Sequence, residues 1–355
     1  HAQRGRRDLV PAADRGGEVV VQTLGEGAHE HILPYPGTRS SGDTGQVHLL
    51  ARTTLALGAA AAAGLGYSVA EAHRYTLRRE EARVLPDGVP PVRVLHISDL
   101  HLTPRHRGRM AWVRSLDALN PDLVVVTGDF LAHQEAVPSV LDALGPLLDR
   151  PGLFVLGSND YYGPGIVKPW RYLTKPSDLD EQRPPLPWRD LVSGLTAAGW
   201  HDLDNAAARV KVGDLDLDVR GVDDPHIGLD RYDEVAGPFA ADADLRLGVT
   251  HAPYRRVIDA MEADGADLVL AGHTHGGQLC VPFWGALVTN CDLPTAQAKG
   301  LSRVGGADLF GTPGAGGPDG RGALLHVSAG LGTSPYAPVR FACPPEATLL
   351  TLTRV

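Results

Sequence analysis

Short apolar runs, each followed by a polar block, constrain the fold of this 355-residue chain more than any other feature. Three of them are VRVLHI at 92–97, DLVVVT at 122–127 and LFVL at 153–156. Each is continuous in its apolar character and has the length of a strand. Strands of this kind are typical of βαβ units in a sheet that is covered on at least one face. We therefore expect an α/β fold.

The rest of the chain completes this expected fold. Helical spacing of apolar residues predicts helices at 107–120, near 135–148 and at 187–198. Alternating residues on either side of Gly213-Asp214 predict a hairpin. Later strands are expected at 245–250, 267–271, 278–282, 323–328 and 347–353. Mixed α/β structure that becomes rich in strands indicates two sheets packed together with helices outside. The Gly-rich stretch 302–321 is expected to be a surface loop.

Five polar blocks follow predicted strands, and all five contain side chains that bind metals or move protons. They are Asp99-Leu100-His101, Gly128-Asp129, Gly157-Ser158-Asn159-Asp160, Thr250-His251 and Gly272-His273-Thr274-His275. Functional side chains in α/β folds gather outside the carboxyl ends of the strands. The shared placement of the blocks therefore predicts a single site.

The residue types in these blocks favour metal binding. Asp99 and His101 are two apart, so on extended backbone they point to the same side and can hold one cation, and His273 and His275 repeat this spacing. The glycine before Asp129 allows a sharp turn that presents its carboxylate. Carboxylates together with imidazoles suit Mn, Fe or Zn. The ligands are numerous enough for two ions that share a carboxylate, an arrangement that clamps both oxygens of a phosphoryl displacement.

The order of the blocks resembles the motif of the calcineurin-like metallophosphoesterase superfamily, which runs Asp-x-His, Gly-Asp, Gly-Asn-His-Asp/Glu, His, Gly-His-x-His. SDLHL and AGHTHGGQ resemble the membrane-associated bacterial branch that includes the YkuE- and YaeI-type phosphodiesterases, and GSNDYY, GVDDPH, GALVTNCD and VRFACPPEATLLTL look like its actinobacterial version. The resemblance covers residues 91–355. It implies a four-layer αββα fold, in which a β-sandwich lies between helices, and a metal-dependent phosphoester hydrolase with a dinuclear site.

The resemblance also implies residue roles. Seven metal ligands are carried over: Asp99, His101 and His275 for the first ion, Asp129 as the bridge, and His251, His273 and Asn159 for the second. Asp129, Asn159 and His251 are the expected catalytic residues. A bridging hydroxide would attack phosphorus in line. The identity of the two ions is left open among Mn, Fe and Zn, because the same ligands bind all three.

The third block departs from the family motif. Aligned without a gap, Ser158 falls on the motif's asparagine and Asn159 on its histidine, which is expected to protonate the leaving group. Either the loop shifts so that Asn159 binds the second metal, which we favour, or Asn159 keeps the histidine position and that metal loses a ligand. Under both alternatives the enzyme lacks this general acid, which typically increases the reaction rate about 10²–10⁴-fold. The enzyme then either prefers good leaving groups or uses another donor.

Four further side chains are candidates for this missing role or for binding substrate. Tyr161, Tyr162 and His226 are candidate acids, and Arg105 is a candidate ligand for phosphate oxygens. The dense polar run that contains His226 follows a predicted strand and is equally compatible with an Asx turn.

The N-terminal part of the chain differs in composition from the rest. Residues 1–48 read as a poorly ordered tail, 49–85 as an apolar helix with a linker, and 86–355 as the metallophosphoesterase domain. Residues 53–70 form an uncharged run of 18, just long enough to cross a bilayer but weak in content, so a soluble Ala-rich helix is the alternative. Four arginines follow the run, which favours a cytoplasmic catalytic domain.

Charge and cysteine content limit the partners of the chain. A net charge of −9 argues against nucleic-acid binding, because such proteins gain affinity from basic surface. Its three cysteines are too few and too scattered for a disulfide scaffold and are expected to be buried small residues. The expected substrate is a small-molecule phosphoester or a lipid headgroup. A pyrophosphatase of lipid- or sugar-nucleotide-linked diphosphates and a catalytically degenerate protein-binding scaffold are the alternatives.

Overall fold

The computed structural model describes residues 43–165, 183–304, 322–334 and 337–355. The chain divides into two units, His1–Leu55 and Ala56–Val355. Of the first unit, only the beginning of helix α1 (Asp43–Glu71) lies in the described part. The expected tail therefore lies largely outside the described residues, as does most of the expected Gly-rich loop.

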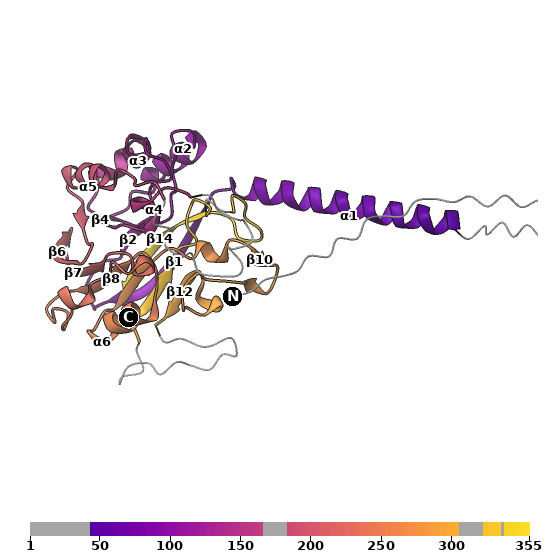
Figure 1. The fold of residues 1–355 in the computed structure, drawn as a ribbon. Helices are drawn as coiled ribbons and strands as arrows, with labels where there is room; N and C mark the ends of the chain where they lie inside the picture. The colour runs from indigo at the N-terminus through magenta and orange to yellow at the C-terminus, as the bar shows by residue number, and fades with distance from the viewer. Residues whose placement is uncertain (1–42, 166–182, 305–321, 335–336) are drawn as a thin grey trace, which may run out of the picture. The chain divides into compact units, whose positions relative to one another are not determined.

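Two six-stranded sheets form the second unit (Figure 1). In the first sheet the strand order is β1 (Thr76–Leu85), β14 (Glu346–Arg354), β2 (Val92–Ile97), β3 (Leu123–Thr127), β4 (Gly152–Val155) and β5 (His201–Asp202). In the second it is β12 (Gly300–Arg303), β13 (Leu324–Val327), β9 (Leu268–Ala271), β8 (Leu245–Thr250), β7 (Leu215–Val222) and β6 (Ala206–Val212). Both sheets are mixed, since parallel β2-β3-β4 and β7-β8-β9-β13 adjoin antiparallel neighbours. The predicted α/β sandwich is confirmed.

Three apolar clusters define the layers. Between the sheets, alternate residues of β2, β3 and β14 meet those of β7, β8 and β9. Outside the first sheet lie α2 (Arg107–Ser115), α3 (Val137–Leu144) and α5 (Trp188–Ala197), which bury the other faces of β2, β3 and β4. Helix α6 (Arg255–Ala263) covers the outer face of the second sheet. The central strands β2, β3, β4, β8 and β9 are buried on both faces, which explains why their sequences are largely apolar.

Most predicted elements are present, but several differ in extent. The strand expected at 278–282 is limited to Cys280–Val281, the helix expected near 135–148 is α-helical only over Val137–Leu144, and residues 302–303 of the expected loop belong to β12. The helix expected at 107–120 ends as an α-helix at Ser115 and continues as a 3₁₀ turn, Leu116–Leu119. Strand β1 pairs in parallel with β14, so the first sheet includes residues that the sequence assigns to the linker 49–85. The predicted hairpin across Gly213-Asp214 is formed by β6 and β7.

Helix α1 is apolar enough to span a membrane. Its segment His48–Glu71 has 24 residues and a mean hydropathy of 1.4. Most of the segment is exposed, whereas Ser68 and Glu71 near its end are buried. Near its C-terminal end, the Ser68 carbonyl accepts a hydrogen bond from the Arg340 backbone N–H, and the Tyr67 ring packs edge-on against Phe341. These contacts pack the last turns of α1 against residues Arg340 and Phe341 of the same unit.

Candidate metal centre

The polar blocks lie where the sheets bring the carboxyl ends of their strands together. Strands β2, β3 and β4 run parallel in the first sheet, and β8 and β9 run parallel in the second. Backbone hydrogen bonds join the blocks directly: the Asp99 N–H donates to the Gly128 carbonyl and the His101 N–H to the Asp129 carbonyl. The Gly272 N–H donates to the carbonyl of His251.

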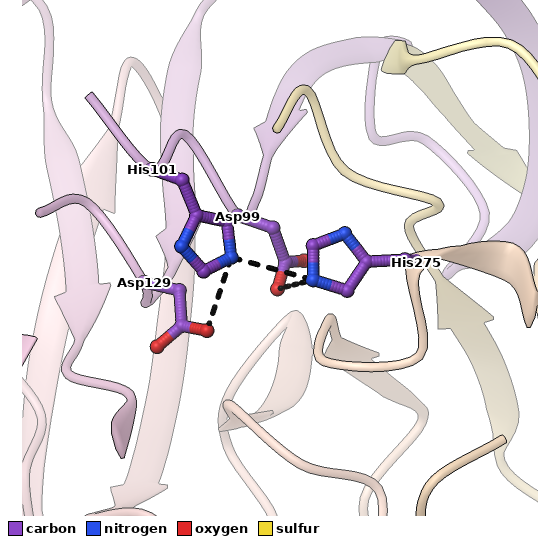
Figure 2. Close-up of side chains that lie close together, drawn as sticks. All are labelled: Asp99, His101, Asp129 and His275. Carbon is purple, nitrogen blue, oxygen red and sulfur yellow. Dashed lines mark hydrogen bonds and ion pairs between the residues drawn. The ribbon is translucent and has the colours of Figure 1, made fainter. Parts of the chain in front are cut away.

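Four of the predicted ligands form one compact, buried cluster (Figure 2). A ligand atom from each of Asp99, His101, Asp129 and His275 lies within 4.8 Å of all the others. The Nε2 atom of His101 is 3.4 Å from an Asp129 oxygen and 3.3 Å from the Nε2 atom of His275. His275 Nε2 is in turn 3.6 Å from Oδ1 of Asp99.

The positions of these four side chains are explained better by a shared metal ion than by hydrogen bonds among the side chains. Two ring nitrogens face each other, and Oδ1 of Asp99 is buried without a hydrogen-bond partner. The separations of 3.3–3.6 Å are long for hydrogen bonds. They match the spacing of atoms that share an ion at about 2.0–2.2 Å. An unpaired buried carboxylate oxygen would cost free energy, and a cation removes that cost.

His251 presents a further nitrogen beside Asp129, and the ring of His273 packs against the ring of His251. The Nδ1 atom of His251 lies 2.6 Å from the Thr127 carbonyl, which leaves its Nε2 atom facing an Asp129 oxygen at 3.5 Å. Nε2 of His273 lies 3.2 Å from the carbonyl of Asn290, which frees Nδ1. A backbone acceptor on one ring nitrogen fixes the tautomer that presents the other as a ligand.

Backbone strain is concentrated in the same residues. Asp99, His101, Asp129, His273 and His275 all adopt positive φ, between 40° and 69°. This left-handed region costs most side chains about 1–3 kcal/mol and is populated where the surroundings impose it, often at functional sites. Four of these five side chains, all except that of His273, meet in the cluster described above.

The titratable side chains of the site fall into two sets: a charged pair, Asp129 and His251, and a set of neutral histidines. Burial opposes charge on both Asp129 and His251, but each stabilises the other, so the pKa of Asp129 lies well below and that of His251 well above its usual value. Burial lowers the pKa of His101 to about 4 and also depresses those of His273 and His275. Neutral imidazoles are the form that binds metals.

The third block lies at the start of α4 (Ser158–Tyr161) and contacts Asp129. The backbone N–H and the side-chain NH₂ of Asn159 each donate to the Asp129 carboxylate at 2.8 Å. Its oxygen accepts a 2.8 Å bond from Arg183, a guanidinium that is itself buried. Asn159 rather than Ser158 is thus the residue beside Asp129. The assignment of amide oxygen and nitrogen follows this hydrogen-bond pattern.

Asp160 holds the loop that carries Asp129. Its buried carboxylate accepts hydrogen bonds from the backbone N–H groups of Asp129, Leu131 and Gly157. Burial and the neighbouring Asp129 raise the pKa of Asp160 to about 8.

Of the two candidate tyrosines, Tyr161 has its hydroxyl bonded to a carboxylate and is therefore not free to protonate a leaving group. The Tyr161 hydroxyl donates to both carboxylate oxygens of Asp223 at 2.9 Å. Its ring packs edge-on against Trp188, on the side of the helical layer. Tyr162 is half-buried and pairs through its backbone with Pro185.

Of the remaining candidates, His226 lies at the site and Arg105 does not touch it. The His226 ring is 4.5 Å from the ring of His273, centroid to centroid, and its Nδ1 atom is 3.1 Å from the Tyr254 hydroxyl. Arg105 lies on an exposed turn ahead of α2.

Two buried arginines that the sequence did not single out support the ligand loops. Arg340 is fully buried and donates to the backbone carbonyls of His275, Ala329, Gly330, Gly332 and Cys343. Arg109 donates to the carbonyls of Leu100 and His101. Arg109 follows the first block closely in sequence, whereas no local signal marks Arg340.

The sequence model of the calcineurin-like phosphoesterase family matches residues 92–277, slightly more than half of the chain. This segment includes all five polar blocks. The chain belongs to this family. The predicted membership is confirmed, and with it the activity class: the protein is a phosphoester hydrolase.

Curated relatives place this metallophosphoesterase among bacterial members of the family. It is 24% identical over 314 residues to the metallophosphoesterase YkuE of Bacillus subtilis, covering 84% of this chain and 93% of YkuE. It is 25% identical over 302 residues to the phosphodiesterase YaeI of Escherichia coli, covering 82% and 94%. A transmembrane protein with a metallophosphoesterase domain from Danio rerio is 25% identical over 206 residues, covering 55% of this chain and 43% of that protein.

Proposed function

We propose that this metallophosphoesterase hydrolyses phosphodiesters at a site for two divalent cations. One observation carries the proposal: the same Asp129 oxygen lies 3.4 Å from a nitrogen of His101 and 3.5 Å from a nitrogen of His251. A carboxylate oxygen between two imidazoles from different sheets is suited to be shared by two ions. Asp99 and His275 would complete the first ion site, and His273 and Asn159 the second.

When bound, the two cations would supply an activated water and neutralise charge on the transferring phosphoryl group. The chain's own residues fix the positions of the ligands. Asn159 and the backbone around Asp160 orient the Asp129 carboxylate, while the Thr127 carbonyl orients His251. For Asn159 to bind an ion through its oxygen, its amide must turn over, and its NH₂ would then face Arg183.

The helix α1 supports a membrane setting for the reaction. We propose that its 24-residue apolar segment anchors the enzyme and that the domain expected from residue 86, extended by β1, lies on the cytoplasmic face. An anchored enzyme meets phosphodiesters of lipid headgroups at high local concentration, so these are the favoured substrate class.

Hydrolysis of bis(4-nitrophenyl) phosphate by the full chain in detergent, with added Mn²⁺, Fe²⁺ or Zn²⁺, tests the proposal. We expect turnover in the wild type and a loss of at least 10³-fold in Asp129→Asn, because the amide keeps the shape but removes the shared charge. Metal analysis of the same samples should give two ions per chain in the wild type and fewer in the variant.

Two results would contradict the proposal. A folded wild type that binds metal but hydrolyses neither this diester nor a diphosphate diester would favour a protein-binding scaffold. Hydrolysis of the diphosphate diester alone would favour a pyrophosphatase.

A further inference from the structure

A hairpin next to the metal centre carries the most exposed aromatic side chains of the described residues. Strands β10 (Cys280–Val281) and β11 (Gly285–Ala286) form this hairpin. At its tip Phe283 is fully exposed and Trp284 is 80% exposed. Val281 and Leu287 flank them and are also exposed. Large apolar side chains grouped in this way on a surface mark an interaction site.

The hairpin lies in a stretch without charge. No Asp, Glu, Lys or Arg occurs from Gly276 to Cys291, although charged residues make up 21% of the chain. Residues 281–285 and Leu287 are the exposed part of this stretch, and none of them is charged. A Trp beside apolar residues and without charges is the composition that prefers the boundary between lipid and water.

The base of the hairpin is built into the metal centre. Gly277 adopts a φ of +82° and packs so closely against Ala286 that a Cβ atom could not be accommodated. Beyond β11, the carbonyl of Asn290 bonds to His273. The hairpin therefore continues the loop that carries His273 and His275, and the position of its tip is coupled to that of the ligands.

The same base adjoins the end of the apolar helix α1. Phe341 joins the two: its N–H donates to the Gln278 carbonyl, and its own carbonyl accepts from Cys280, where β10 begins. Its ring packs at 5.6 Å, centroid to centroid, against Tyr67 in the last turns of α1. One residue thus contacts both the hairpin and the helix that is apolar enough to span a membrane.

We propose that the hairpin tip, residues 281–287, inserts into the headgroup region of the bilayer that α1 spans, and so holds the metal centre at the membrane surface. The proposed binding partner of the tip is the lipid headgroup region. The tip's apolar character and its junction with α1 carry the argument. The consequence for substrate choice rests on the proposed phosphodiesterase function, whereas the insertion itself does not.

Fluorescence quenching by lipid tests the insertion without reference to activity. The full chain is reconstituted in vesicles of phosphatidylcholine and phosphatidylglycerol, 3:1, with and without phosphatidylcholine spin-labelled near the headgroup. Helix α1 contains no Trp, so its insertion gives no direct signal. We expect a quenched Trp component that Trp284→Phe removes and that Trp200→Phe, which replaces a buried indole, retains. Equal quenching in wild type and Trp284→Phe would overturn the proposal.

A second experiment distinguishes a failure of this proposal from a failure of the proposed function. The double variant Phe283→Ser/Trp284→Ser should lose at least tenfold of the activity on a phosphodiester embedded in vesicles and none on soluble bis(4-nitrophenyl) phosphate. Leu229→Ser, a substitution at an exposed apolar residue elsewhere, should change neither activity. Equal losses on both substrates would contradict a membrane role for the tip. Inactivity of the wild type on every phosphodiester would instead refute the proposed function and leave the quenching result valid.

Discussion

The Asp129 side chain is fixed before any cation arrives. Its carboxylate receives two hydrogen bonds from Asn159, and its backbone N–H is held by Asp160. Arg183 in turn holds the Asn159 amide in place. A ligand whose rotamer is locked by neighbouring hydrogen bonds binds its ion with little reorganisation. The departure of the third block from the family motif therefore coincides with a local hydrogen-bond network around the Asp129 carboxylate.

Leaving-group protonation is a property of single side chains, and the contacts favour His226 over Tyr161. His226 packs on His273, at the metal centre, whereas the Tyr161 hydroxyl is bonded to Asp223. We expect His226→Ala to make the rate depend more steeply on leaving-group pKa, with a loss of about 10²-fold for poor leaving groups. Initial rates over a series of substituted phenyl phosphodiesters measure this slope.

The control for this prediction is Tyr161→Phe. Its slope should equal that of the wild type even if the variant is less stable. A slope that is steep in the wild type and unchanged in His226→Ala would show that no residue replaces the family's histidine.

At the scale of elements, the loops that carry the ligands depend on the buried guanidinium of Arg340. It bonds to carbonyls on both sides of the site, in the loop after β13 and in the loop that carries His275. Lys could not serve all of these acceptors, because its ammonium has three donors and Arg has five in a planar fork. Arg340 therefore links the C-terminal segment to the metal centre.

Arg340→Met should destabilise the protein because it leaves several buried carbonyls without donors. We expect the free energy of unfolding to fall by about 3 kcal/mol or more. Urea titration of the full chain in detergent measures the change. Arg114→Met, which removes an exposed pairing with Asp142, should cost less than about 1 kcal/mol. Equal losses in the two variants would contradict a supporting role for Arg340.

The sequence predicts elements well where burial leaves a clear pattern. Strands β2, β3 and β8 are buried along their length and are found within one residue of the predicted ranges. Strand β1 was read as linker because it is an edge strand with four exposed residues and several charges. Burial by a partner strand 270 residues away leaves no local trace in such a segment.

The residue types of the candidate site could be predicted from the sequence, but the backbone conformations and the residues that hold the ligands in place could not. Asp99 and His275 follow strands and carry a recognisable motif, so their grouping could be inferred. Their positive φ values could not be inferred, because tertiary contacts impose them against local preference. Arg340 and Asn290 act through backbone carbonyls, and that kind of contact has no sequence signature.

At the scale of the whole molecule, a buried histidine pair joins the two sheets. Nδ1 of His96 on β2 lies 2.8 Å from Nδ1 of His326 on β13, and Nε2 of His96 bonds to Thr127. Burial lowers the pKa of His326 to about 3 and that of His96 well below its usual value. Both rings are therefore neutral in the folded protein near neutral pH.

This pair makes the stability of the sandwich depend on pH. Between pH 6.5 and 3 the unfolded chain binds a proton at His326 that the folded chain does not, so stability falls as the pH falls. At pH 5 the loss is about 2 kcal/mol for this one site. We expect His326→Gln to lack that part of the loss between pH 7.5 and 5 in urea titrations. Parallel pH profiles for the variant and the wild type would show that His326 does not titrate in this way.

The pairing of β1 with β14 has a consequence for biosynthesis. Thr76 opposes Glu346, so the strand that follows α1 has its only neighbour in the sheet about 270 residues later in the sequence. Until residues 346–354 have been synthesised, β1 has no partner in the sheet, a state open to mispairing and proteolysis. A chain that lacks residues 346–354 leaves β1 without this partner, and we expect such a chain to be more sensitive to proteolysis.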